Sequence, residues 1–159
     1  MMQPKMNSQW YEGKKIWVVR FDPGQDILLT LEAFIAEKNI VQGMVIMGYG
    51  TMSQVRMHWV THNRFPTDNI IETREGGYEL MSMNGMIVEG KPHIHFTAAS
   101  KEGSFGGHLE EGCICYVLAE IGILELEGPP MSREMVPVAE DSKGTPVLKP
   151  QLRFGSYPG

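Results

Sequence analysis

The sequence predicts a β-rich fold of about seven strands with one main helix. From residue 27 to residue 38, apolar side chains recur at i, i+1, i+4, i+7 and i+8, which gives one face of an amphipathic helix (Ile27, Leu28, Leu31, Phe34 and Ile35). Asp26 precedes this run and can cap the helix. No other segment keeps a 3.6-residue period. The remaining apolar segments are short, rich in β-branched and aromatic residues, and bounded by turn residues, as strands are.

The expected strands follow one another along the chain. Residues 15–21, KIWVVRF, form the first, and later strands are expected at 44–47, 54–60, 78–88, in a hairpin over 92–108, and at 113–121. The glycines of residues 48–51 indicate a tight turn, and residues 64–77 indicate a polar connection. Gly85 lies inside an expected strand, where glycine marks a bulge or the close approach of another backbone.

Length and composition limit the possible function classes. The 159 residues are enough for one domain with its own core, and the net charge is −5. The scattered Lys and Arg residues supply no obvious electrostatic footprint for nucleic acid. No segment approaches the ~18 apolar residues of a membrane span, and no apolar N-terminal run resembles a signal peptide, so we expect a cytoplasmic protein. We expect an N-terminal arm over residues 1–13, a domain over 14–127 and a proline-rich extended tail over 128–159.

Three of the five histidines lie in the expected hairpin. His93 and His95 share one strand face because side chains alternate along a strand. A loop centred on Lys101 and Glu102 would place His108 opposite His95, with Cβ atoms roughly 5 Å apart, whereas an odd loop would turn it away. Three imidazoles on one face suit a zinc-type ion. Ordinary packed or exposed strand histidines are the alternative interpretation. The other two histidines are set aside, because four residues along a strand separate them too widely to share an ion.

The strand expected at 113–121 carries two further candidates. Cys113 and Cys115 share a face and are interpreted as buried core thiols. Glu120 lies on the other face, which is the face of His108 unless Gly112 introduces a bulge. A carboxylate among apolar neighbours needs a partner. It could orient a histidine, carry a proton, pair with a buried arginine or amide, or lie at an exposed strand end, and these alternatives stay open.

Several motifs resemble the plants-and-prokaryotes-conserved (PPC) domain in its prokaryotic stand-alone form. They are GYG, YELMSMNG, GKPHIHFTAAS, GSFGGHLEEGC and LAEI, and the resemblance covers residues 14–127. It implies an α+β fold, with a mostly antiparallel sheet and one principal helix, assembled as a homotrimer. Apolar strand positions and 12 methionines, more than one helix can cover, also favour a partner for the sheet. Plant relatives bind DNA through a separate AT-hook, and this sequence has no Arg-Gly-Arg-Pro segment.

The histidines are also similar to those of acetolactate decarboxylase. That similarity implies zinc ligation by His93, His95 and His108, with Glu120 as a tentative catalytic residue. Three histidines that leave one position open are typical of catalytic zinc. We therefore expect a site that binds or acts on a small molecule, as a metal-dependent lyase or hydrolase if it is an enzyme, and metal binding that weakens as pH falls. A DNA-associated regulator with a structural or sensory ion and a protein-binding scaffold are the alternatives, although the acidic charge does not support DNA binding.

Overall fold

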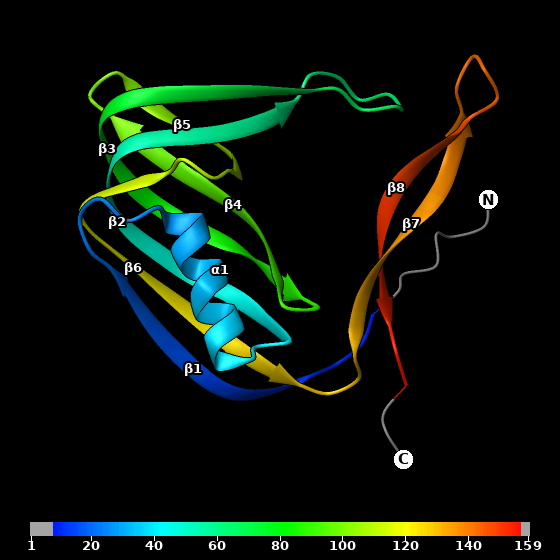
Figure 1. Ribbon diagram of the computed structural model, residues 1–159, viewed down its shortest axis with the longest axis horizontal. Coiled ribbons are helices and arrows are strands. Elements are labelled where there is room, and N and C mark those ends of the chain that lie inside the picture. The colour runs from blue at the N-terminus through cyan, green and yellow to red at the C-terminus, as the bar shows by residue number, and fades with distance from the viewer. Residues whose placement is uncertain (1–7, 157–159) are drawn as a thin grey trace.

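The computed structural model describes residues 8–156, which form a curved antiparallel sheet with a helix against it and a separate hairpin (Figure 1). The α+β class and the single helix are confirmed, with eight strands where about seven were expected. The elements are β1 (Glu12–Phe21), α1 (Ile27–Lys38), β2 (Gln42–Val60), β3 (Asn69–Val88), β4 (Lys91–Ser100), β5 (Gly103–Leu109), β6 (Ile114–Glu127), β7 (Met131–Glu140) and β8 (Pro146–Phe154).

The main sheet has the strand order β1-β6-β2-β3-β4-β5, and β2 also pairs with β5. All of these pairings are antiparallel. Because β2 contacts both β3 and β5, the strands β2 to β5 close on themselves, while β1 and β6 extend the sheet beside the helix (Figure 1). This closure pairs β5 with β2, which lies far from it in the sequence, so residues of both strands can contribute to one site.

Helix α1 begins and ends where the sequence predicts. The Asp26 carboxylate accepts a hydrogen bond from the Leu29 N–H at 3.0 Å, and Asn39 ends the helix in the left-handed conformation. Ile27, Leu31 and Ile35 are buried against the sheet. Within residues 8–156, no helix is long and apolar enough to cross a membrane.

One core joins the helix to the inner side of the sheet. Its members include Phe21, Leu31 and Met57, all fully buried, and each such side chain stabilises the fold by roughly 1.5–3 kcal/mol. Cys113 and Cys115 are buried, free thiols of this core, as predicted. Strand positions that alternate with the core residues therefore point outward, and the histidines of β4 occupy such positions.

Two expected breaks in the sheet are wrong. The turn predicted at 48–51 does not exist, because β2 runs without interruption through Gly48 and Gly50. A Cβ on Gly48 would lie 2.5 Å from the Cβ of Met83, and one on Gly50 would lie 2.3 Å from the Leu118 carbonyl oxygen. These glycines are therefore needed for close strand approach rather than for a turn. The connection expected at 64–77 is shorter, because β3 already begins at Asn69.

The C-terminal part forms a two-stranded antiparallel sheet of β7 and β8. Figure 1 shows this hairpin beside the body, with its far end away from the main sheet. Residues 128–159 were expected to be an extended tail, and the structure pairs much of that segment as two strands. The arm expected at 1–13 lies partly outside the described residues, and β1 already includes Glu12. The division of the chain into arm, domain and tail stays a prediction.

Candidate metal centre

Strand register brings polar side chains into one row across four strands. A two-residue connection, Lys101 and Glu102, joins β4 to β5, and His95 lies directly opposite His108, as predicted. On one side of this pair, β3 places Asn84 opposite His95. On the other side, β2 places His58 opposite His108. The closed part of the sheet therefore assembles a site that no single hairpin could provide.

Three imidazole rings contact one another, and a fourth stacks on one of them. The ring centroids of His93 are 5.4 Å from His95 and 4.7 Å from His108, and those of His95 and His108 are 5.3 Å apart. His58 stacks on His108 with a centroid distance of 4.3 Å and an interplanar angle of 22°. The structure thus brings together the three predicted histidines and adds a fourth.

The spacing of two of the three predicted ligands, His93 and His95, fits a zinc-type ion. Two nitrogens bound to one zinc at ~2.0–2.1 Å, in tetrahedral geometry, lie roughly 3.3–3.4 Å from each other. The Nε2 atoms of His93 and His95 are 3.4 Å apart. The third predicted ligand, His108, lies beside this pair with its ring at 87° to His93 and 77° to His95.

Glu110 lies beside two of the four histidines, His58 and His108. Its Oε1 atom lies 2.5 Å from Nδ1 of His58 and 3.5 Å from Nδ1 of His108. The Nδ1 atom of His108 is buried and makes no hydrogen bond among the described residues. A carboxylate beside Nδ1 is the usual arrangement for a histidine whose Nε2 binds a metal. Among the described residues, the group whose ligand atoms all lie within 4.8 Å of one another is His58, His108 and Glu110, and it shares only His108 with the predicted ligands.

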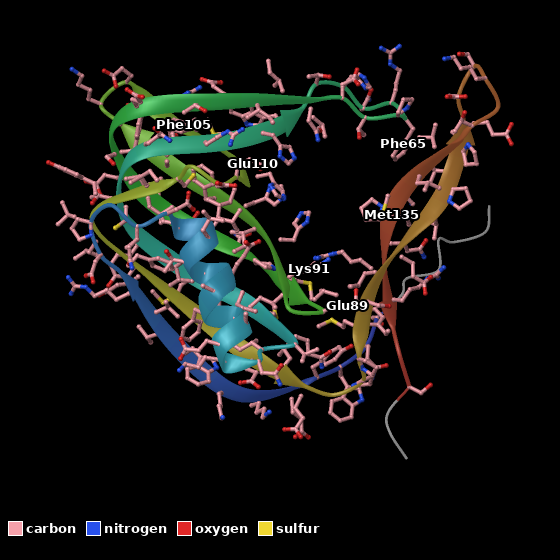
Figure 2. The ribbon with its side chains drawn as sticks, in the orientation of Figure 1. Phe65, Glu89, Lys91, Phe105, Glu110 and Met135 are labelled. Carbon is pink, nitrogen blue, oxygen red and sulfur yellow. The ribbon has the colours of Figure 1, made fainter. Side chains whose placement is uncertain are left out.

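Sequence reasoning missed His58 and Glu110. His58 was compared only with His62, its neighbour along the strand, whereas its contacts come across the β2–β5 pairing. A signal for Glu110 was present in the sequence. Glu110 follows His108 by two residues, the spacing that keeps side chains on one strand face. Figure 2 shows Glu110 near the end of β5, and Glu89 and Lys91 near the turn between β3 and β4.

The surroundings of His93 and His108 favour the neutral form of these two imidazoles. Burial lowers the pKa of His108 from 6.5 to about 4, and the neighbouring His58 and His93 act in the same direction, against Glu110. The pKa of His93 is also lowered, first by burial and then by the positive charge of Arg133. Both rings therefore keep a lone pair available at neutral pH, which is the form that binds metal.

Two glycines allow the histidine strands to pack closely. A Cβ on Gly85 would lie 2.1 Å from the His93 carbonyl oxygen, which confirms Gly85 as a point of close backbone approach. A Cβ on Gly106 would lie 2.3 Å from the Phe96 carbonyl oxygen. Strands β4 and β5 pair across Gly106 without a register shift.

The structure does not bring Glu120 together with the histidines. Glu120 lies on β6 between Arg20 of β1 and Tyr49 of β2, and its carboxylate accepts a hydrogen bond from the Tyr49 hydroxyl. Strands β2 and β3 separate β6 from β4, and adjacent strands lie about 4.8 Å apart. Gly112, with φ +108°, turns the chain between β5 and β6, so face alternation does not carry over from His108. The catalytic assignment of Glu120 stays a prediction.

A curved antiparallel sheet with one helix and an outward histidine cluster defines the structural class. Residues 9–127 match the Plants and Prokaryotes Conserved (PCC) domain, the family named above as PPC. The chain belongs to this family.

Solved structures share the fold. The chain is similar to a plant- and prokaryote-conserved protein of Pyrococcus horikoshii, with 25% identity, a TM-score of 0.67 and coverage of 91% of this chain and 97% of the other. It is also similar to the metal-containing protein AF0104 of Archaeoglobus fulgidus, with 22% identity, a TM-score of 0.69 and coverage of 90% and 98%. A candidate DNA-binding protein of Bacteroides thetaiotaomicron shows 20% identity, a TM-score of 0.66 and coverage of 87% and 96%.

A curated relative is much longer than this chain. The bifunctional protein GlmU of Synechococcus sp. strain JA-2-3B'a(2-13) is 29% identical over 124 residues, which are 77% of this chain and 19% of that protein. The chain therefore spans about a fifth of the length of this relative.

Proposed function

We propose that His93, His95 and His108 hold one divalent ion, zinc, in a site that binds or acts on a small molecule. The observation that carries the proposal is the 3.4 Å separation of the His93 and His95 Nε2 atoms beside a third, steeply inclined ring. A metal-containing protein with the same fold supports it. If the site is catalytic, it belongs to a metal-dependent lyase or hydrolase.

The alternative ligand group of His58, His108 and Glu110 is less suited to one ion. The rings of His58 and His108 are stacked face to face, at 22° and a centroid distance of 4.3 Å. Glu110 is already at hydrogen-bonding distance from His58 Nδ1. We assign Glu110 and His58 instead to the support of the ligands, with Glu110 facing Nδ1 of His108 and leaving Nε2 of that ring for the ion.

The chain's own residues define the chemistry available at this site. A bound zinc ion would act as a Lewis acid toward a carbonyl or similar oxygen. Glu110 is the carboxylate that lies against the cluster, so it is placed to accept or donate a proton there, through His58 if not directly. The neutral state of His93 and His108 leaves the site free of repulsion between imidazolium ions and the metal.

Metal analysis of three purified proteins tests the assignment. We expect about one zinc ion per chain in the wild type and in His62→Ala, because His62 is a partly buried ring near Asp68, outside the cluster. We expect His95→Ala to lose most of its metal, because His95 contacts both other ligands. Equal metal content in all three proteins would contradict the proposal.

We also propose a homotrimer in which copies cover the outer face of β1, β6 and β2. Register aligns Ile16, Leu124 and Met44 in one row of this face and Val18, Gly122 and Met47 in the next. Ile16 and Val18 are 67% and 76% exposed in the single chain. A contiguous apolar sheet face of this kind is typical of an interaction surface. Light scattering that gives the mass of a monomer at micromolar concentration would overturn the assembly.

A second candidate function is that of a DNA-associated regulator. It is favoured by the shared fold of the candidate DNA-binding protein from Bacteroides thetaiotaomicron. The net charge of −5 works against it, because DNA affinity depends on neutralising phosphates. We expect no binding of duplex DNA in a titration from low to physiological salt, whereas tight binding that weakens steeply with salt would favour this candidate. We keep the cytoplasm as the proposed location.

A further inference from the structure

The C-terminal hairpin is fixed to the body at its first residue. Met131, at the start of β7, is 3% exposed, and its N–H donates to the side-chain oxygen of Gln42 at 3.1 Å. The Gln42 amide donates in turn to the Gly128 carbonyl oxygen at 3.4 Å. Gln42 is the one buried polar side chain among the described residues. The base of the hairpin therefore has a defined position, and side chains near it are held in place.

This anchor directs Arg133 toward the histidine strand. Arg133 follows Met131 by two residues without a register shift, so both side chains lie on the face of β7 that is turned to the body. The Arg133 N–H donates to the Glu89 carboxylate at 3.2 Å. Glu89 and Gly90, both with positive φ, form the tight turn that leads into β4, and His93 lies two residues beyond Lys91.

The Arg133 guanidinium is half-buried. Within residues 8–156 it forms no hydrogen bond and no ion pair. Burial lowers its pKa, and the negative charge of Glu89 acts in the opposite direction. The charge of Arg133 is close enough to His93 to lower the pKa of that ring. Arg153, on the facing strand, is satisfied by an ion pair with Glu134 at 2.9 Å. A half-buried guanidinium near a candidate metal centre, with no hydrogen bond or ion pair in the described part of the chain, has donors available for an anion.

We propose that the site takes a small molecule with an oxyanion group, a carboxylate or a phosphate, which Arg133 binds while the rest of the molecule extends to the histidine cluster. The planar guanidinium can donate two parallel hydrogen bonds to either group. Lys91 shares the strand face of His93 and His95 and adds positive charge on the same side. This inference rests on the proposed metal site and specifies the substrate class of that site.

Two measurements on three zinc-loaded proteins test the role of Arg133. The proteins are the wild type, Arg133→Gln and the matched control Arg153→Gln, which removes an arginine from the same hairpin. Calorimetric titration with inorganic phosphate and with acetate measures anion binding, and competition with a chelator measures zinc affinity. We expect Arg133→Gln to weaken anion binding about tenfold or more, the usual loss for a hydrogen bond to a charged group. Arg153→Gln should bind both anions as the wild type does.

The zinc measurement tests, independently of anion binding, whether the charge of Arg133 lies close to His93. Removing a positive charge next to His93 should raise zinc affinity, by a few-fold, in Arg133→Gln and not in Arg153→Gln. Stronger binding of phosphate than acetate identifies a phosphorylated molecule, and the reverse identifies a carboxylate. Equal anion binding by the two variants overturns the inference. Zinc that does not bind the wild type at all overturns the proposed metal site instead, and anion titration of the metal-free proteins still decides the role of Arg133.

Discussion

Two areas of the sheet point away from the core, and their side chains differ in kind. The area on β4, β5 and β2 carries His93, His95, His108 and His58 with Glu110 beside them. The area on β1, β6 and β2 carries Ile16, Val18, Met44 and Met47. Both arise from the same alternation of inward and outward residues. Strand geometry alone therefore does not separate a ligand site from an assembly surface.

The two areas differ in the kind of partner that their side chains can bind. The histidine area offers directed lone pairs and a carboxylate, which suit a small ligand of defined geometry. The apolar area offers no directed groups apart from the Tyr49–Glu120 pair at its border, and it is stabilised by being covered. The row that contains Met44 continues through Met86 to His93, so the two areas meet at one edge. A copy that covers the apolar area would therefore approach the ligand site.

The largest expected effect is on the apolar area. We predict that Val18→Glu dissociates the assembly, because a buried charge without a partner costs roughly 3–5 kcal/mol, which is more than a hundredfold in affinity. Val18 is 76% exposed in the single chain, so the folded subunit should tolerate the change. Sedimentation at micromolar concentration measures the mass. Leu29→Glu, at a 45% exposed position on α1, is the control and should leave the mass unchanged. If Val18→Glu remains a trimer, a different surface forms the assembly.

The next effect concerns the support of the histidines. We predict that Glu110→Gln lowers zinc affinity roughly 10–100-fold, the usual cost of removing a carboxylate behind a ligating histidine. The amide keeps the shape of the side chain but loses the charge that faces Nδ1 of His58 and His108. Chelator competition measures the affinity. Glu111→Gln is the matched control, since its side chain is exposed and forms no hydrogen bond or ion pair among the described residues. Equal zinc affinity in the two variants would remove Glu110 from the site.

Local sequence patterns were sufficient to predict the helix, the β4–β5 register and the convergence of three histidines. Each depends on residues close together in the sequence: the Asp26 cap, the two-residue connection, and the alternation of His93 and His95. The contribution of His58 could not be predicted in this way, because it depends on the closure of β2 onto β5 across the whole sheet. The expected turn at 48–51 failed for a related reason. Glycine permits both a turn and close strand packing, and only the neighbouring strands decide between them.

The smallest effect is a pH dependence that arises in the histidine area. In the metal-free protein, the folded chain keeps His108 neutral down to a pKa of about 4, whereas the unfolded chain takes up a proton near 6.5. Between these values the unfolded state binds more protons, so stability falls as pH decreases from about 6.5 to about 4. The full shift would correspond to roughly 3 kcal/mol, and solvent screening of this partly buried ring reduces the expected loss to about 1–2 kcal/mol.

Urea unfolding of the chelator-treated protein at several pH values measures this loss. We expect His108→Gln to make the profile shallower in this window, because the variant lacks the His108 shift, while the lowered pKa of His93 keeps part of the slope. His62→Gln should keep the wild-type slope, since His62 lies outside the cluster beside Asp68. Parallel profiles for the wild type and His108→Gln would mean that His108 titrates normally. In that case its burial in the cluster would not be what keeps the ring neutral and ready for a metal.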